Sequence, residues 1–405
     1  MSALPCLVFS NSFPPDHAGG YELGAGNLVD ALRRFCGWKI RVFSSVRKQT
    51  PPGILSPPLT GFFPGRLGPA YRRRLVKREL VARHEGICAA IDREAERAEV
   101  ILVFNPRRLI YPQWVRLLDS PTPVVFFVSD FWPQDPLGAD LFYAGLAKRR
   151  HSLRPRDPAL DVIYNPFLQE EAIFSRAKGV IFCSRFLQQT HRETFDGLEH
   201  QTVIHWGTNP ERFPKSAKDG EHLKVFGFCG RAVPEKGLDR ALQAFSELLR
   251  RDARLKLLVA SDLTTSHGRL LRRQISRNRG LEHSVELLGQ VPHEEMHEKF
   301  FRRIGWLMFP SVWEEPFAST VVEAMASGVV VIGSFTGGTP EILHEACGYP
   351  YDPSDSAALL EACRKALNRA DHHGILADRA HQRILGQFNL PVMAEKLDKF
   401  VRGLL

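Results

Sequence analysis

The sequence of 405 residues predicts an α/β fold in which two Rossmann-like domains, each with a parallel sheet, face each other across a cleft. Three observations lead to this prediction. Short apolar runs alternate with helical patterns along the chain, as they do where crossover helices join parallel strands. The alternation begins again at residue 223. A polar, proline-bearing stretch at 207–222 separates the two halves and is the predicted linker.

The first half, 1–206, opens with the apolar run CLVFS, which the helical pattern AGNLVDALRRF follows. Its later predicted strands are KIRVFSS, VILVF, VVFFV, GVIFCS and TVIHWG. The second half, 223–385, begins with LKVFGFCG and the helical pattern GLDRALQAFSELL, and continues with LKLLVAS, VELLG, GWLMFPS and VVVIGS. Residues 386–405 are expected to form a helix that crosses back to the first domain.

Composition and charge narrow the class of protein. Seven scattered cysteines without a CxxC pair favour a reducing cytoplasm over a disulfide frame or a zinc ribbon. The amino-terminal segment has no basic region ahead of its short apolar run, so it is predicted to be a strand and not a signal peptide. No apolar run approaches the length of a membrane span. The formal charge of +9 indicates an anionic partner, but the absence of nucleic-acid motifs argues against nucleic acid.

Two carboxylates stand out in WEEPFASTVVEAMASG, where Glu315 and Glu323 are eight positions apart. On one continuous helix they would lie about 12 Å apart along the axis and on different faces. Pro316 instead disfavours helix at Glu315, and Ser319 or Thr320 is a good N-cap for a helix that follows. We therefore expect Glu315 in a loop and Glu323 one turn inside the helix. Two acids beside the amide groups of a helix start suit a ligand with hydroxyls at both ends and phosphate between, such as a sugar nucleotide.

Cations follow the first strand of the second half, in GFCGRAVPEKGL. The strand ends at Gly230, and Arg231 and Lys236 flank the loop at its carboxyl end, where α/β sheets bind ligands. A guanidinium and an ammonium suit a diphosphate, although by themselves they also fit two surface cations. In the turn after VELLG, the backbone of Val291 is the candidate contact for a nucleobase. The histidines show no metal-binding spacing, and His267, His283 and His293 are expected at the surface.

The order of these segments resembles family 4 of the retaining glycosyltransferases, the glycosyl transferases group 1, which have the GT-B fold. The segments are Gly-Arg…Glu-Lys-Gly, the strand-glycine turn, Pro-Ser…Glu-x7-Glu-Ala-Met-Ala-Ser-Gly, and Gly-Gly-x-Pro-Glu-Ile. In the first half, SNSFPPDHAGGYELGAGNLVDAL, VIFCSRFLQQ and VIHWGTNPERF resemble the family's opening loop, central segment and hinge segment. The resemblance covers nearly the whole chain and is more specific in the second half.

The resemblance implies roles for particular residues. Arg231 and Lys236 match the pair that neutralises the donor diphosphate. Glu323 matches the acid that holds the ribose hydroxyls, and Glu315 the acid that faces the transferred sugar. The backbone of Phe317, Ala318 and Ser319 matches the turn that touches sugar hydroxyls and phosphate. Gly19 and Gly20 match the loop of the first domain that closes on the donor.

The chain also departs from the family pattern. Ala318 stands where glycine is usual, and the hinge has His-Trp-Gly-Thr in place of Asn-Gly-Ile-Asp. No histidine follows the strand VVFFV, so the residue expected to touch the reacting sugar is Asp130, which fits equally well as a helix N-cap. The family is thought to use a front-face reaction in which the leaving phosphate helps to deprotonate the acceptor. Cations would then stabilise the diphosphate, and neither a cofactor nor an essential metal is expected.

The function implied is a retaining glycosyltransferase, a hexosyltransferase of polysaccharide biosynthesis that uses a nucleotide-sugar donor. The acceptor is a glycan, a lipid-linked sugar or a small molecule. Three alternatives stay open: a nucleotide-sugar epimerase of the same fold, a phosphorylase-like enzyme, and a non-catalytic anion-binding module. The sequence names neither the donor base nor the sugar.

The segment 66–83 contains one acid, Glu79, among many basic residues. Two interpretations fit this segment. It holds a cytoplasmic protein against the anionic inner face of a membrane, or it forms a solvated, cation-rich surface without a partner. The basic residues are Arg66, Arg72, Arg73, Arg74, Lys77, Arg78 and Arg83.

Overall fold

The computed structural model describes residues 3–10, 13–15, 20–44, 54–55, 85–105, 111–134 and 174–405. These residues form two compact units. The first unit comprises Met1–Ile204 together with Ala394–Leu405, and the second comprises His205–Met393. The basic segment 66–83 lies outside the described residues.

The first unit is built on a parallel sheet. Its described part has seven strands in the order β3-β2-β1-β4-β5-β6-β7, and every pair is parallel. β1, β4, β5 and β6 are almost wholly buried, which explains why their sequences are continuous apolar runs. The bounds are β1 Pro5–Ser10, β2 Lys39–Ser44, β3 Ile54–Leu55, β4 Val100–Asn105, β5 Val124–Val128, β6 Gly179–Phe182 and β7 Gln201–Val203.

Helices pack on this sheet, among them α1 against β2 and α7 against β6. The last helix, α15, joins the unit through Asp398, whose carboxylate accepts a hydrogen bond of 2.6 Å from the buried indole N–H of Trp38. The bounds are α1 Gly20–Cys36, α3 Tyr111–Leu118, a 3-10 turn η1 at Trp132–Gln134, α7 Arg185–Thr190 and α15 Leu390–Arg402. Residues 85–95 are also helical.

The second unit has a six-stranded parallel sheet in the order β10-β9-β8-β11-β12-β13. In order along the chain this is 3-2-1-4-5-6, the strand order of a dinucleotide-binding Rossmann fold. The order reverses between β8 and β11, which are hydrogen-bonded neighbours. The bounds are β8 Val225–Cys229, β9 Lys256–Ala260, β10 Val285–Leu287, β11 Trp306–Phe309, β12 Val330–Ser334 and β13 Gly348–Tyr351.

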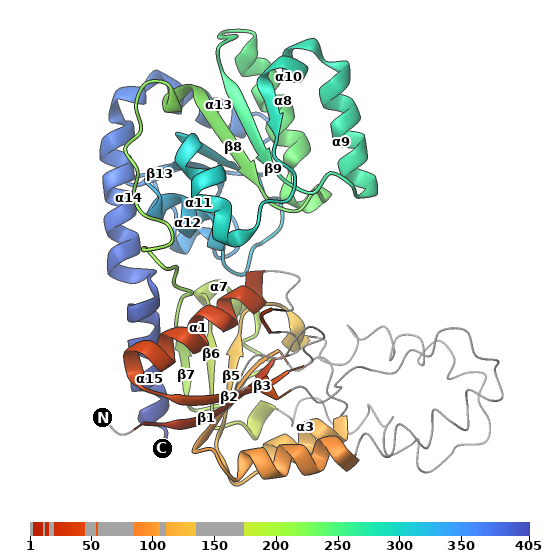
Figure 1. Cartoon of the computed structure of the whole chain (residues 1–405), viewed down its shortest axis with the longest axis vertical. Coiled ribbons are helices and arrows are strands. Elements are labelled where there is room, and N and C mark those ends of the chain that lie inside the picture. Colours follow the sequence, from red (N-terminus) through yellow and green to blue (C-terminus); the bar gives the residue numbers. More distant parts are fainter. Residues whose placement is uncertain are drawn as a thin grey trace, which may run out of the picture. The chain divides into compact units, whose positions relative to one another are not determined.

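Two layers of helices cover the second sheet (Figure 1). On one face, alternate strand side chains such as Trp306, Met308 and Val330 join a single core with α8, α9, α10 and α13. On the other face α12 and α14 pack against each other and against β12. The bounds are α8 Leu238–Leu249, α9 Ser266–Arg277, α10 Arg279–Ser284, α11 Met296–Lys299, α12 Ser319–Ala326, α13 Ala358–Asn368 and α14 His373–Gln387, with short 3-10 turns η4 Pro234–Lys236, η5 His293–Glu295 and η7 Thr339–Glu341.

Each strand named from the sequence overlaps a strand of the structure. The two strands that the sequence analysis did not name, β3 and β13, are the outer strands of their sheets. β3 has two residues, and β13 contains Pro350, so neither has the long apolar pattern of a central strand. In the part of the chain that the structure describes, no helix has both the length and the apolar character needed to cross a membrane.

Candidate functional site

The candidate site lies in the second unit at the carboxyl ends of β8 and β11. The strand order reverses between these two strands, and open α/β sheets bind ligands at such a point because the loops after the two strands diverge. The loop after β8 carries Arg231 and Lys236, and the loop after β11 carries Glu315. The strand order therefore brings together residues that are far apart in the sequence.

The loop after β8 is fixed against the loop after β11. Gly237 has the left-handed φ of 70°, and a Cβ atom there would overlap the carbonyl oxygen of Pro310. The backbone N–H of Val312 donates a hydrogen bond of 2.9 Å to the carbonyl oxygen of Glu235. Because Lys236 lies between Glu235 and Gly237, these contacts set the position of its backbone.

Lys236 pairs with Glu315. Its Nζ contacts Glu315 Oε1, and the hydroxyl of Ser311 donates a hydrogen bond of 2.8 Å to the same oxygen. Glu315 is buried with 8% exposure, whereas the Lys236 side chain is 23% exposed. The backbone of Glu315 is held as well, since the N–H of Gly338 donates to its carbonyl oxygen at 2.7 Å. The site thus holds an ion pair whose ammonium is partly open to solvent.

Arg231 is exposed at the start of the same loop. Among the described residues it has no carboxylate partner, in contrast to Lys236. Gly230, which precedes it, donates a backbone hydrogen bond of 3.3 Å to Ala260 at the end of β9. The site therefore contains one cation that is paired and one that is exposed.

Helix α12 begins at Ser319, with Glu315 in the loop before it and Glu323 one turn inside it, as predicted. The prediction that Ser319 or Thr320 is the N-cap is wrong. The N-cap is Ala318, which forms no side-chain hydrogen bond with the helix start. Burial of Phe317 and Ala318, with 9% and 3% exposure, fixes this turn by packing, so no polar side chain is needed to begin the helix.

Glu323 accepts a hydrogen bond from His293, whose Nε2 lies 2.8 Å from Glu323 Oε1. The expectation that His293 is a surface residue is wrong, since its side chain is 17% exposed and that of Glu323 is 14% exposed. Burial, and after it the charge of Glu323, raise the pKa of the Cys229 thiol at the end of β8. The carboxylate of Glu323 therefore lies near the carboxyl end of β8. Its contact with His293 spans 30 positions, and no sequence pattern pointed to it.

The predicted base contact, Val291, is half-buried two positions before His293 and just ahead of η5. The turn that carries Val291 is thus the same turn that reaches Glu323 through His293.

The hinge histidine, His205, also reaches the site. Its Nε2 lies 2.7 Å from Glu341 Oε2, in the turn η7 of the sequence GGTPEIL. Its ring centroid is 6.0 Å from that of Phe317, in the turn before α12. The residue that departs from the family's hinge pattern therefore links two turns of the candidate site.

The remaining predicted residues belong to the first unit. Gly19 lies outside the described residues, and Gly20 is the exposed first residue of α1. Asp130 follows β5, and its Oδ1 accepts a hydrogen bond of 2.8 Å from the N–H of Trp132, the first residue of η1. Its Oδ2 accepts from Asn105 at 3.3 Å. Asp130 thus makes one local contact of the kind that a cap makes, with Trp132, and one contact with Asn105 at the end of β4.

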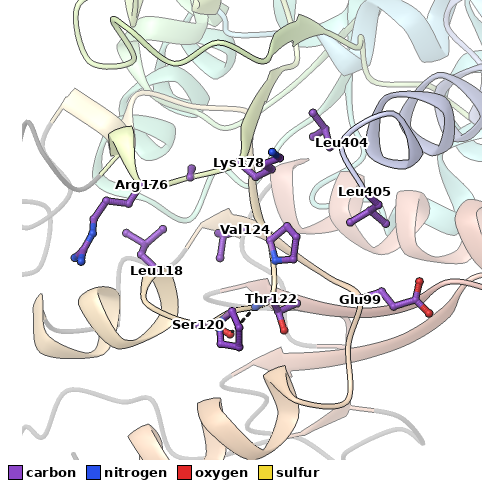
Figure 2. Close-up of a pocket in the computed structure, with 12 residues that line it drawn as sticks. Glu99, Leu118, Ser120, Thr122, Val124, Arg176, Lys178, Leu404 and Leu405 are labelled. Carbon is purple, nitrogen blue, oxygen red and sulfur yellow. Dashed lines mark hydrogen bonds between the residues drawn. The ribbon is translucent and has the colours of Figure 1, made fainter.

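A cavity of about 550 Å³ in the first unit is lined by none of the predicted site residues. Glu99, Pro123 and Lys178 line it, and each immediately precedes a strand of the sheet, so the cavity lies at the amino ends of β4, β5 and β6. Figure 2 shows Leu404 and Leu405, from the end of the chain, beside it. Ligands of α/β sheets bind at the opposite, carboxyl ends of the strands. Within the described ranges, no cluster of three or more His, Cys, Asp or Glu side chains is arranged to hold a metal ion.

Comparison with known proteins identifies a family to which the second unit is similar. Residues 209–383 match the family model described as glycosyl transferases group 1. Residues 209–383 form a glycosyl transferases group 1 domain. The matched region includes the residues placed around the carboxyl ends of β8 and β11.

Similar curated proteins support this assignment. The chain is 24% identical over 273 residues to a lipopolysaccharide 1,2-N-acetylglucosaminetransferase of Salmonella typhimurium, and the aligned region covers 63% of this chain and 70% of that protein. It is 29% identical over 196 residues to an uncharacterized glycosyltransferase of Methanocaldococcus jannaschii, over 44% of this chain and 48% of that protein.

Solved structures share the fold over the whole chain. Sucrose-phosphate synthase from Thermosynechococcus elongatus matches with a TM-score of 0.72 at 19% identity and covers 99% of each chain. The Anabaena protein HepE in complex with UDP-glucose matches with a TM-score of 0.67 at 17% identity, over 99% of this chain and 100% of that chain. The GT-B fold class predicted from the sequence is thereby confirmed.

Proposed function

We propose that this glycosyltransferase transfers a sugar from a nucleotide-sugar donor with retention of anomeric configuration, and that the second unit binds the donor. The observation that carries the proposal is the arrangement around α12. Lys236 contacts Glu315 in the loop before α12, and α12 begins without a side-chain cap and carries Glu323 one turn inside it. Arg231 is exposed on the same loop as Lys236. A sugar nucleotide has the matching order of hydroxyls, diphosphate and hydroxyls.

Each residue then has a role that its position allows. Arg231 and Lys236 bind the diphosphate, where they stabilise the charge that grows on the leaving group during transfer. Glu323 accepts hydrogen bonds from the ribose hydroxyls, and Glu315 faces the sugar that is transferred. The backbone of Val291 contacts the base, and the turn Phe317, Ala318 and Ser319 contacts the sugar and phosphate.

The Lys236–Glu315 pair has a consequence for binding. A diphosphate that approaches Lys236 competes with the carboxylate of Glu315 for the same ammonium group. Arg231, which is exposed, is available to the diphosphate without such competition. We expect Arg231 to make the first contact and Lys236 to be shared or released from Glu315 as the diphosphate settles.

The similar proteins support a nucleotide-sugar donor. The Anabaena protein HepE has been solved in complex with UDP and with UDP-glucose, and its structure matches this chain over nearly its full length. The Salmonella relative is named for transfer of N-acetylglucosamine. In the first unit, we propose that Gly19, Gly20 and Asp130 contact the donor sugar or the acceptor.

A thermal-shift screen tests the proposal with UDP, GDP and ADP and with their glucose and N-acetylglucosamine derivatives. A ligand that binds only the folded state at 100 times its Kd raises stability by about 2.7 kcal/mol. Stabilisation by one nucleotide series, followed by release of that nucleotide only when an acceptor is present, supports a transferase. Isomerised donor without acceptor would identify an epimerase. Stabilisation by pyrophosphate equal to that by every nucleotide would indicate an anion-binding module.

The basic segment 66–83 carries a second part of the proposal, which concerns the acceptor. We propose that it brings the protein to an anionic membrane surface, because each nearby cation contributes about 1 kcal/mol of attraction there. The wild type should sediment with vesicles rich in anionic lipid and be released by salt. A variant with Arg72, Arg73, Arg74 and Lys77 changed to glutamine should stay in solution. Failure of the wild type to bind such vesicles at low salt would favour a soluble acceptor.

A further inference from the structure

His293 connects the turn that carries Val291 to the carboxylate of Glu323. It is the first residue of η5, and its Nε2 lies 2.8 Å from Glu323 Oε1. Both side chains are largely shielded from solvent. The contact therefore links the proposed base-binding turn to the proposed ribose-binding acid.

The other side of the His293 ring is also held. Arg212, from the segment that begins the second unit, places Nη1 3.3 Å from His293 Nδ1. Phe213, which is 1% exposed, meets the ring edge-on at a centroid distance of 5.5 Å. A carboxylate, a guanidinium and an aromatic ring thus contact the imidazole, so it is kept from turning away from Glu323.

These contacts decide which ring nitrogen carries the proton. A guanidinium has donors and no acceptor, so a hydrogen bond from Arg212 requires Nδ1 to be an acceptor. The ring proton is then on Nε2, where it is donated to Glu323 Oε1. Burial lowers the pKa of His293, and the hydrogen bond and charge of Glu323 outweigh it, so that the pKa is raised. Glu294 and Arg212 are the other charged groups that act on the ring. The donor on Nε2 is present whether or not Nδ1 is protonated.

Because one carboxylate oxygen is bound to a fixed donor, the plane of the Glu323 carboxylate is restrained before any ligand arrives. A glutamate side chain otherwise loses rotamer freedom on binding, which weakens the interaction. The 2′ and 3′ hydroxyls of a ribose are adjacent donors that a carboxylate in a fixed plane can accept together.

We infer that His293 is a positioning residue that fixes the Glu323 carboxylate and so makes the site select nucleotides carrying both ribose hydroxyls. The inference rests on the proposed donor site. It differs from a general structural role, because it predicts an effect on ribonucleotides that dideoxynucleotides do not share.

Isothermal titration provides the test, with UDP, ADP and GDP each compared with its 2′,3′-dideoxy analogue. His293→Leu removes the donor to Glu323. Ordering one mobile side chain on binding costs about 0.5–1.5 kcal/mol, so affinity for the ribonucleotide should fall by about two- to tenfold. Affinity for the dideoxy analogue should not change. His283→Leu, at an exposed histidine on α10, is the matched control and should leave both affinities unchanged.

Two polar variants keep the test decisive if leucine disturbs folding. His293→Gln places an amide donor near the position of Nε2 and should retain selection for the ribonucleotide. His293→Asn places its amide near Nδ1, short of Glu323, and should lose that selection. Equal losses for both nucleotides in the leucine variant, or equal behaviour of the glutamine and asparagine variants, would overturn the inference while leaving the donor site intact. If the wild type binds none of the nucleotides, the proposed function falls first.

Discussion

Replacing Glu315 by glutamine removes the negative charge that holds Lys236 and keeps the size of the side chain. In the wild type, Lys236 Nζ and the Ser311 hydroxyl both contact Glu315 Oε1. The substitution therefore breaks an ion pair between a cation that is proposed to bind the diphosphate and a buried carboxylate. It should lower the free energy of unfolding and raise the affinity for the free nucleoside diphosphate.

The burial of the two partners sets the size of both effects. Exposed ion pairs contribute about 0–1 kcal/mol, and breaking a fully buried pair costs about 3–5 kcal/mol. With side-chain exposures of 23% for Lys236 and 10% for Glu315, we expect a loss of about 1–3 kcal/mol in the free energy of unfolding. Without the competing carboxylate, Lys236 is available to the diphosphate, and a gain of about 1 kcal/mol corresponds to about fivefold tighter binding.

Chemical denaturation measures the first effect, and titration with the free nucleoside diphosphate measures the second. Sugar transfer, measured at saturating donor, should fall in the same variant because Glu315 is proposed to face the transferred sugar. Glu314→Gln is the matched control, since Glu314 is an exposed neighbour on the same loop. It should leave stability, nucleotide affinity and transfer unchanged.

One result would refute this reasoning. If Glu315→Gln weakens binding of the free nucleoside diphosphate as strongly as Lys236→Ala does, the two residues act as one binding unit and do not compete. Glu315 would then contact the nucleotide itself, and its assignment to the sugar would be wrong.

Substitutions at four other residues test the site and the stability of the two units. Lys236→Ala should weaken nucleoside diphosphate binding by roughly tenfold to a hundredfold, as loss of a charge-assisted contact does; an unchanged Kd would remove Lys236 from the diphosphate site. Glu323→Gln should weaken binding of nucleotide and nucleotide sugar alike, and an effect on the sugar nucleotide alone would contradict the ribose assignment. Gly237→Ala should destabilise the second unit by at least about 2 kcal/mol in denaturation, because the left-handed φ and the overlap with Pro310 both oppose a Cβ atom. Burial, partly offset by a hydrogen bond to the Asp130 carbonyl, lowers the pKa of His191 from 6.5 to about 4. As the pH falls, the unfolded chain therefore binds the proton first, and the free energy of unfolding should fall by up to about 3 kcal/mol between pH 6.5 and 4. His191→Gln should flatten that pH dependence, and an equally steep fall in the variant would exclude His191 as its cause.

Features set by short stretches of chain could be predicted from the sequence alone. Buried strands of a parallel sheet have to be apolar on both faces, so runs such as VILVF and VVVIG identify β4 and β12. Pro316 indicated that the chain is not helical at Glu315, and the apolar spacing after Ser319 indicated the helix that carries Glu323. Where such local signals are weak, as in the short outer strands β3 and β13, the sequence did not show the strand.

Contacts between distant segments were decided only by the tertiary structure. Lys236 and Glu315 are 79 positions apart, and their pairing depends on β8 and β11 being neighbours in the sheet. His293 looked like a surface histidine because its partners, Glu323 and Phe213, lie 30 and 80 positions away. The start of α12 at Ala318 followed from packing of Phe317 and Ala318 and not from a capping side chain. Sequence patterns report the preferences of neighbouring residues, whereas the partners of a buried charge are set by which strands and loops the folded chain brings together.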